Sequence, residues 1–307
     1  MPIASIDVGT NTFRILIGEV QDNGLKKLYI GREITRLGRG FTEEQRVITQ
    51  EAMSMGLSAL KKFRGIIEEY KVGKVRAVAT SVVRESLNGN EFVDKVKREI
   101  GIEIEVIPGK EEARLTVDGV LKSVSVYSDY SVIFDIGGGS TEYIFVKEGN
   151  IIDLRSINLG IVHLTERFLK NEVPSDSDIG ALSLGIDRIL SRELSWIPKI
   201  HDDKLSLVGT AGTPTTFAAI ELGLEKYDPD LVNGFVLKRE GVLQIFRTLI
   251  NLPLQERLKI KGLEKGREDI IIPGTLILLK TMERFSKDEV LVSDGGLLEG
   301  VAFSIDS

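Results

Sequence analysis

A turn in which an apolar strand runs into an aspartate and then into glycine and hydroxyl residues occurs twice in this chain. The first copy is Ile6-Asp7-Val8-Gly9-Thr10-Asn11-Thr12, and the second is Phe134-Asp135-Ile136-Gly137-Gly138-Gly139-Ser140-Thr141-Glu142. A second strand pattern follows each copy. The backbone N–H groups and hydroxyls of such a turn can hold phosphate, and the aspartate can hold a metal beside it. The two copies predict a duplicated domain with a phosphate site between its halves.

The spacing of later landmarks supports the duplication. Thr80 follows Asp7 by 73 positions, and Thr210 follows Asp135 by 75 positions. Each half then reaches a last strand that passes through glycine into a helix. Repetition of several landmarks in one order indicates a repeated structural unit. We therefore expect an α/β protein with domains 1–124 and 125–307, in which a last helix from about residue 297 packs back on the first domain.

The composition limits the kinds of site that this chain can build. Its 307 residues are 42% hydrophobic and 28% charged, which is typical of a globular protein with room for two cores. There are no cysteines and only two histidines, His163 and His201. Thiolate sites and histidine-built zinc sites are therefore excluded, and a hard cation on carboxylates is favoured. The net charge of −6 argues against general nucleic-acid binding.

Apolar periodicity predicts the secondary structure. No secretory signal or membrane span is expected, so the cytoplasm is the expected location. The segment Ile270–Leu279 predicts a buried helix. Thr42-Glu43-Glu44-Gln45 is typical of a capped helix start, with the helix continuing to about residue 70. Further helices are expected near 90–100, after Gly109 and from Pro174 to about 195. Strands are expected at 3–7, 12–20, 25–35, 74–79 and 102–107, and at 131–135, 141–147, 150–157, 204–209 and 289–293.

Several polar residues lie at the predicted carboxyl ends of strands, where ligands bind in α/β sheets. Asp7 and Asp135 either cap their own turns or contact a metal or a phosphate-bound water. Glu111 and Glu112 begin a helix, where acids favour the helix dipole, but either could also activate a water. Arg84, like Arg14 on the second strand, is either a surface residue or a bidentate phosphate ligand. Two more Gly-rich turns, Gly209–Thr213 and Ser293–Gly296, are weak signals alone.

Along essentially its whole length the chain resembles the exopolyphosphatase/guanosine pentaphosphate phosphohydrolase family, in its short form without an extra C-terminal helical domain. The resemblance rests on the motifs Asp7–Thr12, Ala79–Arg84, Gly109–Leu115, Asp135–Glu142, Gly209–Thr213, Gly262–Gly274 with Arg267, and Gly295–Gly300. It implies an actin-like fold of two RNase H-like domains around a central cleft. It also implies hydrolysis that depends on Mg²⁺ or Mn²⁺.

The resemblance also implies roles for individual residues. Glu112 resembles the general base, Asp135 a metal ligand, and Glu142 a residue that positions the metal or the water. Asp7 is the further metal candidate. The predicted phosphate-binding residues are Thr10, Asn11, Thr12, Arg14, Arg84, Gly137, Gly138, Gly139, Ser140, Gly209, Thr210, Gly212, Thr213, Arg267, Gly295 and Gly296.

The substrate implied by the resemblance is a phosphate-rich polyanion, and a homodimer is compatible with it. Exopolyphosphatase activity is the leading hypothesis, and guanosine pentaphosphate (pppGpp) 5′-phosphohydrolase activity is the alternative. A sensor that binds guanosine penta- or tetraphosphate without turnover is disfavoured because all three acids are present. A kinase of the same fold stays open, since fold alone does not fix the reaction. The Glu111-Glu112-Ala113-Arg114 motif favours hydrolysis.

Overall fold

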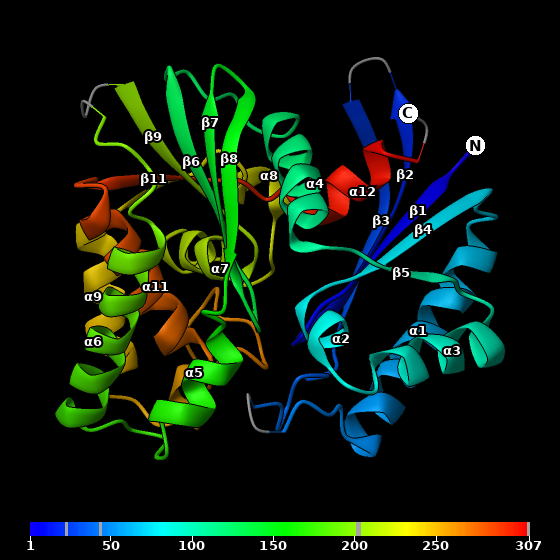
Figure 1. Ribbon diagram of the computed structural model, residues 1–307, viewed down its shortest axis with the longest axis horizontal. Coiled ribbons are helices and arrows are strands. Elements are labelled where there is room, and N and C mark those ends of the chain that lie inside the picture. The colour runs from blue at the N-terminus through cyan, green and yellow to red at the C-terminus, as the bar shows by residue number, and fades with distance from the viewer. Residues whose placement is uncertain (22–23, 43–44, 201–203, 306–307) are drawn as a thin grey trace. The chain divides into compact units, whose positions relative to one another are not determined.

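The computed structural model of the chain describes residues 1–21, 24–42, 45–200 and 204–305. The chain divides into two compact units. Unit 1 comprises Met1–Lys122 together with Gly295–Ser307, and unit 2 comprises Ser123–Asp294. Each unit is a mixed β-sheet covered by helices (Figure 1). The predicted residues Glu43, Glu44 and His201 lie outside the described part of the chain.

Unit 1 contains a five-stranded sheet with the order β3-β2-β1-β4-β5. Strands β1, β2 and β3 form an antiparallel meander, and β4 and β5 continue the sheet parallel to β1. Parallel pairing requires a crossover, which helices provide between β1 and β5. The elements are β1 (Ile3–Val8), β2 (Thr12–Gln21), β3 (Gly24–Ile34), α1 (Gln50–Glu69), β4 (Lys74–Ala79), α2 (Ser81–Glu85), α3 (Gly89–Ile100), β5 (Ile104–Val106), α4 (Gly109–Leu121) and α12 (Leu297–Phe303).

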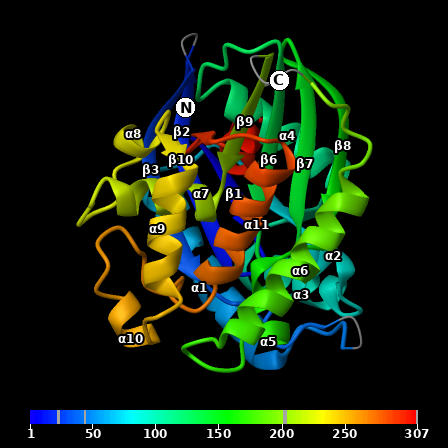
Figure 2. The same ribbon diagram turned by 90° about the vertical axis from the view of Figure 1, so that its left-hand side faces the viewer.

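Unit 2 contains a six-stranded sheet with the order β10-β11-β9-β6-β7-β8. Figure 2 shows α9, α11 and α6 beside one another in this unit. The elements are β6 (Tyr130–Ile136), β7 (Thr141–Lys147), β8 (Asn150–Ile157), α5 (Ile161–Phe168), α6 (Asp176–Glu193), β9 (Leu205–Thr210), α7 (Gly212–Glu221), α8 (Pro229–Val232), β10 (Val236–Lys238), α9 (Arg239–Leu249), α10 (Leu254–Arg257), α11 (Ile271–Arg284) and β11 (Glu289–Val292).

The two sheets share one topology. In unit 2, β8-β7-β6-β9-β11 repeats the order of β3-β2-β1-β4-β5 in unit 1, with the same antiparallel and parallel pairings. Asp7 and Asp135 lie near the ends of the corresponding strands β1 and β6. The repetition confirms the expected α/β class and its duplicated, actin-like, RNase H-like topology.

Each unit has its own hydrophobic core. In unit 1, Phe63 of α1 and Phe92 of α3 are buried against the sheet. In unit 2, α11 lies in the core between α6 and α9, with Ile277 fully buried. Burying one such side chain contributes roughly 1.5–3 kcal/mol. Residues Ile271–Leu279 form the first part of α11 and are buried, so the predicted buried helix at Ile270–Leu279 is confirmed.

Helix α12, after the chain returns from unit 2, packs against β1 and α4 of unit 1. Two glycines permit this approach. A Cβ atom on Gly119 of α4 would lie 1.9 Å from the carbonyl oxygen of Gly296, and one on Gly300 would lie 1.8 Å from that of Leu115. Because backbone atoms are the obstacle, larger residues would force α4 and α12 apart.

The predicted helix start at Thr42 is wrong. Helix α1 begins at Gln50, and the hydroxyl of its N-cap residue Thr49 accepts a hydrogen bond from the backbone of Ala52. Before it, Ile48 is held by the side chain of Asn88, which accepts from its N–H and donates to its carbonyl, both at 2.9 Å. These bonds occupy backbone groups that a longer helix would use.

Strand β10, which pairs antiparallel with β11, is not predicted by the sequence pattern. It has only three residues, so its period-2 pattern is too short to detect. In the described part of the chain, no helix combines the length and the apolar character that crossing a membrane requires.

Candidate active site

The first Asp turn joins β1 to β2, and Arg14 holds its aspartate. Asp7 is buried and pairs with Arg14 across the β1–β2 ladder. Nε and Nη2 of Arg14 donate to Oδ2 of Asp7 at 3.0 and 2.8 Å. The other oxygen, Oδ1, is buried and has no hydrogen-bond partner among the described residues. Arg14 thus neutralises Asp7, while Oδ1 can still accept from a water.

The residues after Asp7 are fixed by the segments around them. The backbone N–H of Gly38 donates to the carbonyl of Thr10 at 2.8 Å. The hydroxyl of Thr10 lies 2.9 Å from that of Ser81, at the start of α2. The side-chain amide of Asn11 donates to the hydroxyl of Thr12 at 3.2 Å. These contacts bring the first turn together with the start of α2, the helix that carries Arg84.

Glu112 and Arg84 form an ion pair in unit 1. Glu112 lies in the first turn of α4, after the N-cap residue Pro108, and its side chain is buried. Nη1 of Arg84 donates to Oε2 of Glu112 at 2.9 Å and to the carbonyl of Ile107 at 3.0 Å. The fold thus joins a predicted base to a predicted phosphate ligand. A guanidinium has five N–H donors, so Arg84 can bind phosphate while it holds Glu112.

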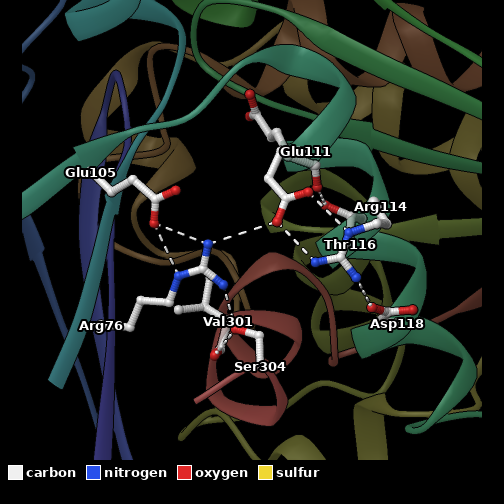
Figure 3. Close-up of polar contacts among 9 residues, drawn as sticks. Arg76, Glu105, Glu111, Arg114, Thr116, Asp118, Val301 and Ser304 are labelled. Carbon is white, nitrogen blue, oxygen red and sulfur yellow. Dashed lines mark hydrogen bonds and ion pairs between the residues drawn. The ribbon is translucent and has the colours of Figure 1, made fainter. Parts of the chain in front are cut away.

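Glu111 has partners of its own in Arg114 and Arg76 (Figure 3). Its two oxygens accept from Nε and Nη2 of Arg114 at 2.9 and 2.8 Å. The pKa of Glu111 is lowered, mainly by the hydrogen bond from Arg114. Arg76 lies 3.7 Å from Glu111 and donates to the hydroxyl of Ser304, just after α12. Glu111 therefore links α4 to Arg76 of β4, and Arg76 in turn contacts the residue after α12, whereas Glu112 faces Arg84.

In unit 2, Asp135 and Glu142 face each other across the β6–β7 ladder. Glu142 is buried, and its Oε1 accepts from the hydroxyls of Ser140 at 2.7 Å and Ser156 at 2.6 Å. Asp135 is half-buried. Residues that are directly opposite in an antiparallel pair have Cα atoms about 4.5–5.5 Å apart and side chains on one face. Unit 2 therefore has two adjacent carboxylates where unit 1 has Asp7 and Arg14.

The Gly137–Ser140 turn is fastened through its backbone. The N–H of Gly137 donates to the carbonyl of Ser140 at 2.9 Å. The carbonyls of Gly137 and Gly138 accept from Ile161 at 3.1 Å and Val162 at 3.0 Å, at the start of α5. Because α5 holds the carbonyls of Gly137 and Gly138, the backbone conformation of the turn is fixed before any ligand binds. Gly139 lies in the same turn, between Gly138 and Ser140.

A second turn of unit 2, after β9, brings together Gly209, Thr210, Gly212, Thr213 and Arg267. The Arg267 guanidinium packs so closely on Gly212 that a Cβ atom there would lie 2.0 Å from Nη1. Gly209 and Thr210 are the buried last residues of β9. Thr213 is buried in the first turn of α7, and its hydroxyl has no hydrogen-bond partner among the described residues. Cation, hydroxyl and helix N-terminus form an arrangement suited to an anion.

The predicted phosphate ligands Gly295 and Gly296 precede α12 in unit 1. The N–H of Gly296 donates to Oε2 of Glu299 at 3.0 Å, and Oε1 of Glu299 lies 2.9 Å from Nζ of Lys27. This N–H is thus engaged within the helix cap. A phosphate-binding role for Gly295 and Gly296 stays a prediction.

A divalent cation fits Asp135 and Glu142 better than Asp7. Within the described residues, no group of three or more Asp, Glu, His or Cys side chains could hold a metal by itself. Mg²⁺ usually uses one or two carboxylates and completes its shell with waters and substrate phosphates. The opposed pair in unit 2 meets that requirement, whereas Asp7 already has a cationic partner in Arg14.

Two serines that support the site are not predicted by the sequence. Ser156 of β8 donates to Glu142, and Ser81 contacts Thr10. Ser156 lies 14 residues from Glu142, so only the pairing of β7 with β8 reveals the contact. Ser81 belongs to the motif Ala79–Arg84. In that motif, the charge of Arg84 indicates a phosphate ligand more strongly than the hydroxyl of Ser81 does.

Comparison with known proteins gives the chain a family context. The model of the Ppx/GppA phosphatase family matches residues 16–306. A bifunctional 3-dehydroquinate synthase/phosphatase of Fusobacterium nucleatum is 34% identical over 97% of this chain, which spans 46% of that protein's length. Exopolyphosphatase 2 of Mycobacterium tuberculosis is 28% identical over 99% of this chain and 98% of its own. The crystal structure of the Aquifex aeolicus Ppx/GppA family member is similar with a TM-score of 0.81 and 36% identity, covering 99% of this chain and 97% of that chain.

Proposed function

Because the chain belongs to the Ppx/GppA phosphatase family, we propose that it is an exopolyphosphatase that releases terminal orthophosphate from inorganic polyphosphate. Membership of a phosphatase family agrees with the enzyme class expected from the sequence, a hydrolase of phosphoric anhydrides. In the proposed reaction, the oxygen of a water forms a bond to the terminal phosphorus, and the bond from that phosphorus to the bridging oxygen breaks. The rest of the chain leaves with the bridging oxygen.

The observation that carries the proposal is the contact between Arg84 and Glu112. Oε2 of Glu112 accepts a 2.9 Å hydrogen bond from Arg84, which fixes the carboxylate beside a cation suited to phosphate. We assign Glu112 as the general base that takes the proton of the attacking water. Arg84 and Arg14 would bind equatorial phosphate oxygens. Phosphoryl transfer needs positioning and charge neutralisation more than covalent catalysis, so no protein nucleophile is required.

We assign Asp135 and Glu142 as the residues that would hold Mg²⁺ or Mn²⁺. A bound cation supplies neutralisation of the negative charge on the phosphate oxygens. The hydroxyls of Ser140 and Ser156 both donate to Oε1 of Glu142, which would hold the carboxylate in place for a cation. In unit 1, Asp7 is paired with Arg14, and its Oδ1 could accept a hydrogen bond from a water.

Each unit has turn residues that we propose as phosphate ligands. In the first turn these are Thr10, Asn11 and Thr12, and in unit 2 they are Gly137–Ser140 and Gly209–Thr213. Backbone N–H groups of such turns bind phosphate oxygens with little steric hindrance. Arg267 would add a positive charge to the turn after β9.

pppGpp is the second candidate substrate. It carries phosphates on the 5′ and 3′ oxygens of its ribose and therefore needs two separate anion contacts. The Arg267–Gly212 contact at the start of α7 supports this candidate, because a guanidinium over a helix N-terminus would give unit 2 a second anion contact besides the Gly137–Ser140 turn, although Arg267 is also paired with Glu264.

Initial rates of phosphate release from polyphosphate and pppGpp, each with Mg²⁺, test the proposal. We expect faster release per enzyme from polyphosphate, and loss of release from both in the Glu112→Gln variant. Faster release from pppGpp would reassign the substrate within the same mechanism. Binding of both ligands without any release would contradict the hydrolase proposal and indicate a sensor.

A further inference from the structure

Arg257 is a buried arginine far along the chain from every predicted site residue except Arg267. It ends α10, and only 2% of its surface is exposed. Removal of a guanidinium from water is costly unless hydrogen bonds replace the lost hydration. Burial lowers the pKa of Arg257, although the carboxylates of Glu172, Asp269 and Glu268 act in the opposite direction. A residue this costly to bury calls for a structural reason.

The hydrogen bonds of Arg257 supply that reason. Its Nε donates to the carbonyl of Leu249 at 3.0 Å, Nη1 to that of Glu268 at 2.8 Å, and Nη2 to that of Glu172 at 2.5 Å. These carbonyls come from the end of α9, the segment before α11, and the segment between α5 and α6. The planar guanidinium thus joins three segments of unit 2, which the single ammonium of lysine could not reach in the same way.

One of these carbonyls, that of Glu268, directly follows Arg267. The backbone around Arg267 is fixed on both sides, since its N–H donates to the carbonyl of Glu264 at 3.1 Å and its own carbonyl accepts from Ile271 at 2.9 Å. Its Nε donates to Oε2 of Glu264 at 3.2 Å. Gly266 has a φ of 89°, a left-handed conformation that favours glycine. The loop therefore has one defined path, which Arg257 anchors at its end.

This path places the Arg267 side chain against Gly212, at the start of α7. The proposed function assigns Arg267 and Gly212 to phosphate binding, and the present inference rests on that assignment. We propose that Arg257 is a positioning residue, which fixes the loop 258–268 so that the Arg267 guanidinium stays over the turn after β9. Arg257 does not itself touch the substrate. Its effect on binding passes through Arg267.

A double-mutant cycle on the full chain tests this coupling. The variants are Arg257→Lys, Arg267→Gln and the double variant, measured for KM and kcat with polyphosphate and for tripolyphosphate binding by calorimetry. Loss of one charge-assisted contact corresponds to roughly a 10- to 100-fold weaker interaction. We expect each single variant to raise KM and Kd by about this factor with kcat changed less. In the double variant, Arg257→Lys should add nothing further. Arg247→Lys, an exposed arginine of α9, is the matched control.

A purely structural role would give a different result. Arg257→Lys would then lower the thermal midpoint while leaving KM and Kd unchanged, or its effect would add in full to that of Arg267→Gln. Either result overturns the proposal. An Arg267→Gln variant with wild-type KM and Kd would instead remove Arg267 from the phosphate site, and with it the route by which Arg257 acts. A wild type that binds tripolyphosphate but releases no phosphate would overturn only the proposed hydrolase function.

Gly266→Ala keeps the test decisive if Arg257→Lys does not fold. It strains the same loop without touching Arg257, since alanine is disfavoured at this φ. We expect a raised KM that again adds nothing in the Arg267→Gln background. An unchanged KM for a folded Gly266→Ala variant would show that the loop path does not set the position of Arg267, which overturns the proposal.

Discussion

Nη1 of Arg84 lies 2.9 Å from Oε2 of Glu112 and 3.0 Å from the carbonyl of Ile107, so one nitrogen fixes both the acid and the chain just before its helix. The contact joins α2, which follows β4, to α4, which follows β5. Both helices begin at the carboxyl edge of the unit 1 sheet, where α/β folds bind their ligands. Glu112 is therefore held in place before a substrate arrives.

Glu112→Gln tests the assignment of the general base. The side chain keeps its shape and can still accept from Arg84 but cannot take a proton. We expect kcat to fall by roughly 10²–10⁴-fold, with KM within a few-fold of wild type, because a general base contributes about this much. Phosphate-release rates across substrate concentration measure both constants.

Glu111→Gln is the matched control, since Glu111 is adjacent in sequence but faces Arg114. Its kcat should stay within a few-fold of wild type. If Glu111→Gln abolished turnover and Glu112→Gln did not, the two roles would have to be exchanged.

Asp135→Asn tests the metal assignment. A hard cation prefers a charged oxygen, so the Mg²⁺ concentration for half-maximal activity should rise by at least about tenfold. Asp7→Asn should raise it less, because Arg14 already binds that carboxylate. Titrations of activity with Mg²⁺ compare the variants, and a larger shift for Asp7→Asn would move the cation to unit 1.

The sequence predicted most strands and both Asp turns, because period-2 patterns and Gly-rich turns are local signals. The residue pattern alone did not separate Glu111 from Glu112, and only the family resemblance singled out Glu112. Both suit the first turn of a helix, and only the positions of Arg84 and Arg114 distinguish them. It also missed Ser156, which meets Glu142 through strand pairing. Thr42 has the residue pattern of a helix cap, but the contacts of Ile48 with Asn88 delay the helix. Such long-range contacts cannot be recognised from the sequence around either residue.

The lowered pKa of Glu111 predicts a pH-dependent contribution to stability. Its pKa is lower in the folded than in the unfolded protein, mainly because of Arg114. The contribution is therefore fully present above about pH 4.5, the ordinary value, and is lost as the pH falls through the folded pKa. Glu111→Gln should lower the thermal midpoint at pH 7, and the difference from wild type should shrink as the pH falls below the folded pKa of Glu111. A difference that stays constant over this range would exclude the Arg114 contact as its cause.

Gly119→Ala tests whether α12 sets the position of α4. The new Cβ would lie 1.9 Å from the carbonyl oxygen of Gly296, and because that atom is backbone, the helices must separate. We expect a loss of roughly 1–3 kcal/mol in the free energy of unfolding, the usual cost of overpacking. Since α4 carries Glu112, kcat should fall as well.

Gly180→Ala on α6 is the control, because its new methyl group would meet no atom of another segment within 4 Å and alanine is the better helix former. It should stabilise the protein by about 0.5–1 kcal/mol without changing kcat. Urea unfolding measures the free energy of unfolding of both variants, and phosphate-release rates measure their kcat. A Gly119→Ala variant as stable and as active as Gly180→Ala would show that the position of α4 does not depend on the close contact with α12.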